Sequence, residues 1–167
     1  MMNKELIKKS AMTFGVFALA LAVDIVTKRL VEAHIGLHDR IDVVGSFVQL
    51  TLLYNRGGVF GILQGHQIFF LVVSFIVLAL LVVFYIYEKN KNLPFIIAMG
   101  LVFSGAVGNI LDRLAGKPGV VDFIYIGDDR YYRWPAFNVA DMAIVVGAVL
   151  LLIGFYLQEK RNKKKSS

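Results

Sequence analysis

The sequence contains no cysteine among its 167 residues. A disulfide framework, a thiolate metal site and a cysteine nucleophile are therefore excluded. Charge is also scarce, because 18% of the residues are charged whereas 57% are hydrophobic. A water-soluble domain of this length cannot bury so much apolar surface, so the composition indicates an integral membrane protein.

The net charge of +6, from 18 basic and 12 acidic residues, raises the question of a nucleic-acid partner. However, ten of the 18 basic residues lie in three clusters that flank apolar runs. Positive flanks of this kind set the orientation of membrane proteins, so we expect no nucleic-acid partner. The clusters are Lys4, Lys8 and Lys9; Lys89 and Lys91; and Lys160, Arg161, Lys163, Lys164 and Lys165.

Four apolar stretches are long enough to cross a membrane, since a hydrocarbon core of about 30 Å takes about 20 helical residues. These spans are about 11–31, 67–87, 93–111 and 138–157. The sequence therefore predicts a mainly α integral membrane fold. We expect a single membrane domain over residues 1–167 with four transmembrane helices.

An even number of spans places both termini on one side of the membrane, and the basic clusters indicate that this side is the cytoplasm. The connections 32–66 and 112–137 are then outer loops, and they contain the lone Trp134. A cleavable signal peptide ending near Ala20 is the alternative. We disfavour it because the apolar run continues through Leu30 and its removal would leave three spans.

The first outer loop is rich in β-forming residues over 41–53, with a break at Gly45-Ser46. Such a composition favours short strands, so we expect a small β-rich cradle on the outer surface of the membrane. The segment 55–61 follows, and its glycines, Gly57 among them, permit close approach of the backbone. We expect this segment to line a cleft.

Three polar side chains fall at a similar depth in the predicted bundle. Counting 1.5 Å per residue from the cytoplasmic ends places Asp24, Asp141 and Asn109 about 22, 24 and 26 Å along their helices. All three would then lie in the outer leaflet. Ionisable groups in lipid are costly, so each one needs a partner or a function.

Two of the intramembrane groups have local partners. Asp24 and Lys28 are spaced i,i+4, which predicts an ion pair on one helical face. Asn109, Asp112 and Arg113 also share a face, where either an Asp112–Arg113 pair caps the helix end or the group orients a substrate. The sequence leaves these two interpretations open.

Asp141 differs because no basic residue lies within one turn of it. Asn138 and Asp141 fit an N-cap with an acidic third residue, which is a structural explanation. A catalytic carboxylate at this depth would need a second one, with which it would share a proton. Asp122, in an apolar segment of the second outer loop, is the candidate, whereas Asp128 and Asp129 fit a solvated turn.

Other chemistries have less support. His34, His38 and His66 lack the spacing of a zinc site, so no metal is expected. A Ser–Lys dyad that uses Lys28 with Ser46 or Ser104 has no supporting spacing. The non-enzymatic alternative is a small transporter or assembly subunit that relays protons. Transporters carry ionisable groups on both sides of the midplane, whereas these lie in the outer half.

Five motifs in order resemble the bacterial lipoprotein signal peptidases, also called signal peptidase II or prolipoprotein signal peptidase. The resemblance covers essentially the whole chain. The motifs are Asp24-Ile-Val-Thr-Lys28; Asn55-Arg-Gly-Gly-Val-Phe60-Gly61; Gly105-Ala-Val-Gly108-Asn109-Ile-Leu-Asp112-Arg113; Val120-Val-Asp122-Phe123; and Pro135-Ala-Phe137-Asn138-Val-Ala-Asp141.

The resemblance implies an aspartic endopeptidase whose catalytic pair is Asp122 and Asp141. It implies that a second group of residues supports the site or binds substrate, and that a third group is structural. The second group is Asn55, Gly57, Asn109, Arg113 and Asn138, and the third is Asp24, Lys28 and Asp112. One departure is Gly58-Val59, where the family commonly carries alanine after the glycine, which affects the expected shape of the pocket.

The implied substrate is a prolipoprotein whose cysteine already bears a diacylglyceryl group, with cleavage just before that cysteine. The resemblance implies no cofactor, and no obligatory protein partner is evident beside the substrate and membrane lipid. It places the protein in the bacterial cytoplasmic (inner) membrane, with the active site toward the outer leaflet. An outer-leaflet site between helices agrees with a lipid-anchored substrate.

Overall fold

The computed structural model describes residues 4–58 and 64–166. Its described part contains four long helices and one antiparallel sheet. The helices are α1 (Lys4–His34), α2 (Gln67–Tyr87), α3 (Leu93–Leu114) and α4 (Val139–Ser166). All four are long and apolar enough to cross a membrane, which confirms the predicted mainly α membrane fold. Helices α1 and α4 extend beyond the expected spans 11–31 and 138–157.

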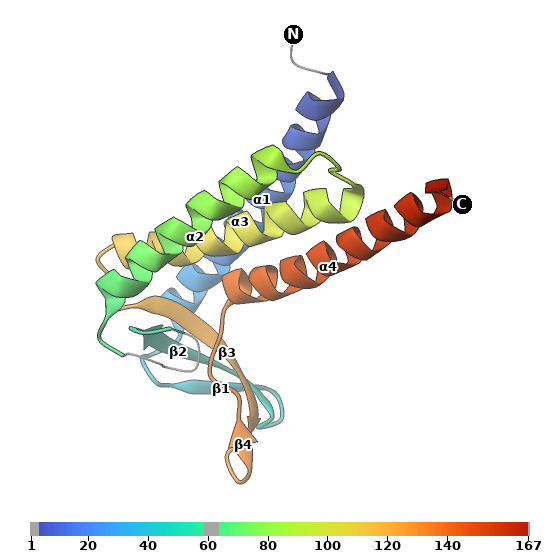
Figure 1. The fold of residues 1–167 in the computed structure, drawn as a ribbon. Coiled ribbons are helices and arrows are strands. Elements are labelled where there is room, and N and C mark those ends of the chain that lie inside the picture. The colour runs from blue at the N-terminus through green and yellow to red at the C-terminus, as the bar shows by residue number, and fades with distance from the viewer. Residues whose placement is uncertain (1–3, 59–63, 167) are drawn as a thin grey trace.

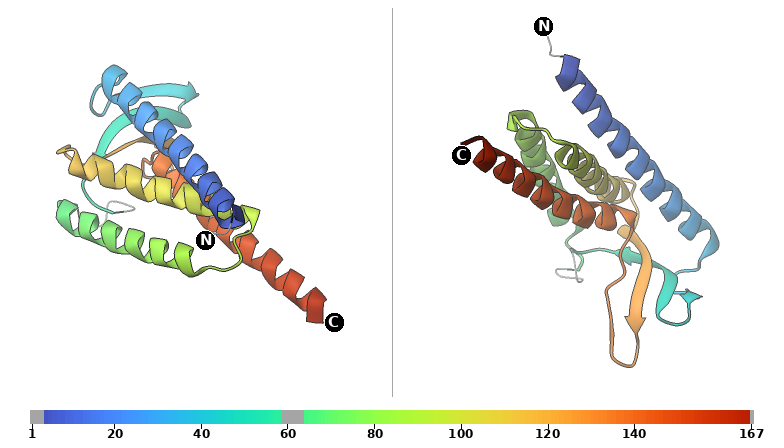
Figure 2. Two further views of the ribbon diagram at one scale, coloured as in Figure 1. Left: turned by 90° about the horizontal axis from the view of Figure 1, so that it is seen from above. Right: turned by 90° about the vertical axis from the view of Figure 1, so that its right-hand side faces the viewer.

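The termini and the sheet lie at opposite ends of the bundle (Figure 1). The start of α1, the end of α4 and the short connection between α2 and α3 share one end, and the sheet lies at the other. Figure 2 shows α3 between α1 and α2. The arrangement is the one that an even number of spans requires.

Helix α3 is the centre of the bundle, and small residues let its neighbours approach it. A Cβ built on Gly100 would lie 2.8 Å from the carbonyl oxygen of Thr13 in α1. A Cβ on Gly105 would collide with the carbonyl oxygen of Ala140 in α4. Glycine at these positions therefore brings three helix backbones together, as small residues do in membrane bundles.

The start of α3 is fixed to α4 by one side chain. Asn92 caps α3, because its Oδ1 accepts the N–H of Phe95 at 2.9 Å. Its Nδ2 donates to the carbonyl oxygen of Gly154 at 2.9 Å. Pro94 follows in the first turn, where its missing N–H costs nothing. This end of the bundle is therefore tied together by an ordinary helix cap.

The sheet contains four antiparallel strands in the order β1-β2-β3-β4. The strands are β1 (Arg40–Val44), β2 (Val48–Asn55), β3 (Val120–Asp128) and β4 (Tyr132–Arg133). The strands expected within 41–53 are thereby confirmed. The cradle is larger than expected, because the second outer loop contributes β3 and β4. Gly119 allows the two loops to meet, since a Cβ there would lie 2.5 Å from the carbonyl oxygen of Asn55.

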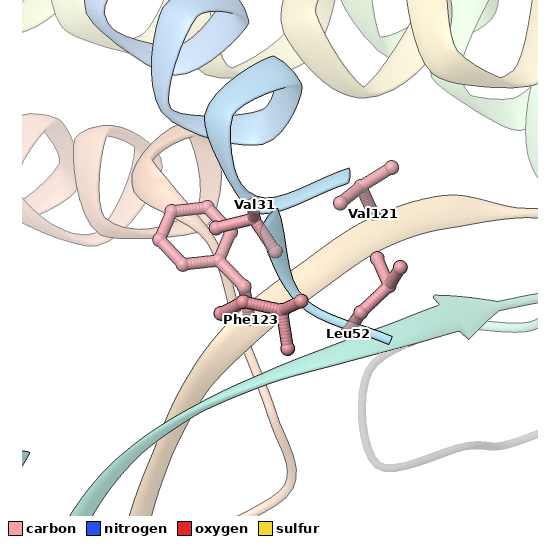
Figure 3. Packing of buried hydrophobic residues seen from close by; sticks show 5 residues of the cluster. Val31, Leu52, Val121 and Phe123 are labelled. Carbon is pink, nitrogen blue, oxygen red and sulfur yellow. The ribbon is translucent and has the colours of Figure 1, made fainter. Parts of the chain in front are cut away.

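A small hydrophobic core joins the sheet to the helices. Val31 near the end of α1 packs with Leu52 of β2 and with Val121 and Phe123 of β3 (Figure 3). Val121 is fully buried and Phe123 is 5% exposed. Because Asp122 lies between these two residues, the packing that buries them also fixes the backbone of Asp122.

Candidate active site

The two aspartates that the sequence analysis singles out come from different elements and meet at one asparagine. Asp122 lies in β3, and Asp141 lies in the first turn of α4. Asn138 Nδ2 donates to Asp122 Oδ1 at 2.7 Å, and the backbone N–H of Asn138 donates to Asp141 Oδ2 at 3.2 Å. Asn138 is completely buried. It therefore links the two carboxyl groups.

The local structure at the start of α4 is a reciprocal cap. The N–H of Asp141 donates to Asn138 Oδ1 at 2.9 Å, while Asp141 Oδ2 accepts the N–H of Asn138. This is the capping arrangement that the sequence offered as a structural explanation for Asp141. The cap also orients the carboxyl group of Asp141, so the structural explanation and a catalytic role are compatible.

Two further asparagines complete the donors to the carboxyl groups. Asn55 of β2 donates to Asp122 Oδ2 at 3.1 Å. Asn109 of α3 donates to Asp141 Oδ1 at 2.8 Å, and its own Oδ1 accepts Asn138 Nδ2 at 3.2 Å. Each carboxyl group therefore accepts uncharged N–H groups at both of its oxygens. Neutral donors orient a carboxyl group without fixing it permanently in the charged form.

The surroundings of Asp122 favour a proton. Its exposure is 3%. Burial, followed by the negative charge of Asp141, raises the pKa of Asp122 from an ordinary 3.8 to about 7, although the amides of Asn55 and Asn138 act in the opposite direction. Desolvation and a like charge both disfavour the ionised form. Near neutral pH, Asp122 therefore holds a proton more readily than an ordinary aspartate does.

Asp24 and Lys28 form the predicted ion pair, and Asp112 joins it. Lys28 Nζ lies 2.8 Å from Asp24 Oδ2 and 2.9 Å from Asp112 Oδ2. The three side chains are 0 to 9% exposed. Lys28 Nζ also donates to Asn109 Oδ1 at 3.2 Å, so the polar groups placed at one depth by counting do meet. The partners of Lys28 are acidic and amide groups rather than Ser46 or Ser104.

The alternative of an Asp112–Arg113 pair is not what the structure contains. Asp112 bonds Lys28 and Lys117, the latter at 3.1 Å. Arg113 turns the other way, donating to the carbonyl oxygens of Asn109 at 3.2 Å and Gly57 at 3.3 Å. Residues one apart on a helix point about 100° apart, which is why the adjacent charges find different partners. Arg113 thereby ties α3 to the first-loop motif.

The outer end of this charge network was not predicted from the sequence. Lys117, between α3 and β3, bonds Glu32 of α1 at 2.8 Å, and Tyr54 donates to Glu32 at 3.1 Å. Burial lowers the pKa of Lys117, but its bonds to Glu32 and Asp112 outweigh that effect and raise it. Glu32 follows Lys28 at the same four-residue spacing, which indicates the helix face it shares, but the structure pairs it with Lys117 and not with Lys28.

The first-loop motif lies against the site as far as the structure describes it. Asn55 Oδ1 accepts the N–H of Gly57 at 3.0 Å, which closes a tight turn beside Asp122. A Cβ on Gly58 would lie 2.5 Å from the ring of Phe70 in α2, which gives a physical reason for glycine in place of alanine. The rest of the expected lining, residues 59–61, lies outside the described residues.

The comparisons with known proteins agree on one family. A family model described as signal peptidase (SPase) II matches residues 16–157. The lipoprotein signal peptidase of Staphylococcus haemolyticus is 36% identical over 146 residues, which cover 86% of this chain and 89% of that protein. The lipoprotein signal peptidase of Shouchella clausii is 38% identical over 156 residues, covering 93% of this chain and 99% of that one.

A solved structure is also similar to this chain. It is a bacterial membrane enzyme determined by the in meso method at 2.3 Å resolution. It is 33% identical in sequence and superimposes with a TM-score of 0.80 over 92% of each chain. The likeness therefore covers the helices and the sheet together.

Proposed function

This chain belongs to the signal peptidase II family, and we propose that it removes signal peptides from diacylglyceryl-modified prolipoproteins by cleaving just before the modified cysteine. The family establishes a protease that processes lipoproteins and a multi-pass membrane protein. The proposal adds the bond that is cleaved, the groups that cleave it and the side of the membrane on which this happens.

The proposed mechanism uses Asp122 and Asp141 as one unit that shares a proton. The ionised carboxylate takes a proton from a water molecule, whose oxygen attacks the scissile carbonyl carbon. The protonated carboxyl group gives its proton to the carbonyl oxygen, so a neutral tetrahedral intermediate forms. The carboxyl group that took the proton from water then gives it to the leaving nitrogen, while the other carboxylate takes a proton from a hydroxyl of the intermediate. The peptide bond breaks, and the pair again shares one proton. The bridging hydrogen bonds of Asn138 are the single observation that most strongly supports this pairing.

The proposed supporting roles follow from the contacts. Asn55, Asn109 and Asn138 hold the two carboxyl groups in place with neutral donors. Arg113 and Asn55 hold the turn at Gly57 beside Asp122, so this turn would border an extended peptide bound next to the dyad. No step of this mechanism uses a metal or an organic cofactor.

A lipid-anchored substrate suits the position of the dyad. Asp141 lies in the first turn of α4, at the end of the bundle that carries the sheet (Figure 1). None of the residues of α2 is buried, so this helix packs at the periphery of the bundle, where it would contact lipid. We propose that the signal peptide approaches sideways within the bilayer. The modified cysteine would then reach the dyad at the boundary between lipid and water.

The proposed orientation places both termini in the cytoplasm. Basic residues occupy the start of α1 and the end of α4, which share one end of the bundle. The positive-inside rule assigns that end to the cytoplasm, so the sheet and the dyad would face the outside of the inner membrane.

The test uses purified protein and a synthetic precursor peptide with and without the diacylglyceryl group. We expect cleavage of the modified peptide alone, with the modified cysteine as the new amino terminus by mass spectrometry. A chelator should leave the rate unchanged. Equal cleavage of both peptides, or a cut at another bond, would contradict the proposal.

A further inference from the structure

The backbones that carry the two aspartates are held by two other aspartates. The N–H of Ala140, which precedes Asp141, donates to Asp24 Oδ1 at 2.9 Å. The N–H of Val121, which precedes Asp122, donates to Asp112 Oδ2 at 3.2 Å. Each member of the proposed dyad therefore has a buried carboxylate fastened to the peptide just before it.

One ammonium group, that of Lys28, bridges the carboxylates of Asp24 and Asp112. Lys28 Nζ lies 2.8 Å from Asp24 and 2.9 Å from Asp112. Its remaining bond, to Asn109 at 3.2 Å, leads to the side chain that donates to Asp141. The ammonium group of Lys28 therefore contacts three side chains, Asp24, Asp112 and Asn109. These side chains hold α4, β3 and the Asp141 carboxyl group, respectively.

The surroundings make this bridge rigid. The side chains of Lys28 and Asp24 are 3% and 0% exposed. Gly108 of α3 lies against the pair, since a Cβ there would be 2.5 Å from Asp24 Oδ2. Separating a buried ion pair leaves each charge without a partner, which has a large cost in free energy. The bridge therefore keeps one geometry.

From this arrangement we propose that Lys28 is a positioning residue for catalysis, which sets the separation of the Asp122 and Asp141 carboxyl groups through Asp24 and Asp112. The inference rests on the proposed function, because it assumes that these two aspartates are the dyad. It goes beyond an ion pair that merely neutralises charge in the membrane. A dyad that shares a proton is sensitive to its separation, and a misplacement of 1 Å can cost about a hundredfold in rate.

The main test removes the bridge without adding an unpaired charge. In the double variant Asp24→Asn/Lys28→Met, the amide introduced at position 24 keeps an oxygen for the N–H of Ala140, and Asp112 keeps its bond to Lys117. The net charge is unchanged. We expect kcat on the lipidated precursor to fall about a hundredfold with KM within about twofold, because the substrate still binds but the carboxyl groups are misaligned.

The pH profile separates positioning from simple electrostatics. The charged groups that face Asp122 are Asp141 of α4, Lys28 of α1 and Arg113 of α3. Losing the positive charge of Lys28 alone would raise the pKa of Asp122 and move the alkaline limit of activity upward. If the two carboxyl groups move apart and become more hydrated, both the burial of Asp122 and its repulsion from Asp141 weaken. Positioning therefore predicts that the alkaline limit of activity moves downward, by about half a pH unit or more.

Two further variants serve as controls. Glu5→Gln/Lys9→Met removes another i,i+4 ion pair of α1, 3.0 Å long but exposed, and should leave kcat and the pH profile unchanged. Lys28→Arg keeps the positive charge but replaces the compact ammonium with a larger planar group. It should lower kcat about tenfold, because the bridge changes its span while its charge stays.

Each outcome decides the question. A lower melting temperature with unchanged kcat and pH profile per folded enzyme would reduce the bridge to a stability element and overturn the proposal. An upward move of the alkaline limit of activity would also overturn the proposal, because it would show that Lys28 acts through its positive charge and not through positioning. Absence of a cooperative melting transition in both Lys28 variants would make the bridge a folding requirement only. Asp122→Asn, assayed alongside, separates the two levels. If it cleaves the precursor, the dyad itself is refuted; if it is inactive while the Lys28 variants keep the wild-type kcat and pH profile, only the role of the bridge is refuted.

Discussion

Strand β3 carries an aspartate near each end, and their surroundings are opposite. Asp122 is 3% exposed and accepts hydrogen bonds from two side-chain amides. Asp128 lies beside an exposed turn and accepts a hydrogen bond from the guanidinium of Arg130 at 2.9 Å. Burial raises the pKa of Asp122 to about 7, and the hydrogen bonds from Arg130 lower the pKa of Asp128. One strand thus favours the protonated form of this side chain at one end and the ionised form at the other.

The ion pairs of the two regions repeat this difference. Lys28–Asp24 and Arg40–Asp129 are both 2.8 Å long. The first pair is 3% and 0% exposed, whereas the second is 42% and 60% exposed. Because solvent screens the second pair, equal distances do not mean equal consequences. Burial, not distance, distinguishes the site from the surface.

Replacing either aspartate of the proposed dyad gives the largest expected effect. Asp122→Asn and Asp141→Asn should each slow cleavage of the lipidated precursor by about a thousandfold or more, because an amide cannot exchange the proton. The double variant should be little worse, since the two groups act as one unit. The matched control is Asp128→Asn, which should cleave at the wild-type rate. Comparable losses at Asp122 and Asp128 would erase the contrast between the two ends of β3.

The pH dependence of stability should differ in sign between these aspartates. The folded state raises the pKa of Asp122 from 3.8 to about 7, so its contribution to stability is full below pH 3.8 and is lost as the pH rises to about 7. The loss is on the order of 1–4 kcal/mol. Asp122→Asn should therefore raise the melting temperature in detergent relative to wild type, more at pH 8 than at pH 5.

The folded state lowers the pKa of Asp128, so its contribution is present at neutral pH and is lost on acidification. Asp128→Asn should therefore give no gain in melting temperature at pH 8. If the melting temperatures of Asp122→Asn and Asp128→Asn changed with pH in the same direction, burial would not explain the opposite pKa shifts of the two carboxyl groups.

The close packing behind the dyad can be tested with two glycines. Gly105→Ala would place a methyl group against the carbonyl oxygen of Ala140, beside Asp141. We expect it to lower the free energy of unfolding by about 1–3 kcal/mol, because backbone cannot move aside cheaply. Gly15→Ala is the control, since its Cβ would meet nothing within 4 Å. Melting temperatures in detergent should fall for the first variant and not for the second.

The smallest effect is expected on the exposed side of the comparison. Asp129→Asn breaks the bonds to Arg40 and Arg133, both at 2.8 Å. Because Asp129 is 60% exposed, we expect no measurable change in melting temperature or cleavage rate at 0.15 M salt, a concentration on the order of physiological ionic strength. A clear loss of activity would show that the β3–β4 turn takes part in catalysis or in substrate binding.

The site was predictable where the sequence alone carries the chemical signal. Asp24 and Lys28 pair as their four-residue spacing predicts, and Asn109 joins them at the depth found by counting. Asp112 was not predictable in the same way, because its partners Lys28 and Lys117 come from another helix and from a connection. Spacing along one helix says which residues share a face, but not which element that face meets.

The sequence by itself determined the number of membrane helices, because a run of about 20 apolar residues has few other stable forms in a bilayer. It also determined the first two strands of the cradle and the cap formed by Asn138 and Asp141, since both depend on neighbouring residues. Only the tertiary structure decided that β3 pairs with β2 and that Phe137 pairs with Ile124, which brings Asn138 to Asp122. Contacts between distant segments depend on how whole elements pack, and that packing is a sum over many side chains that no local pattern contains.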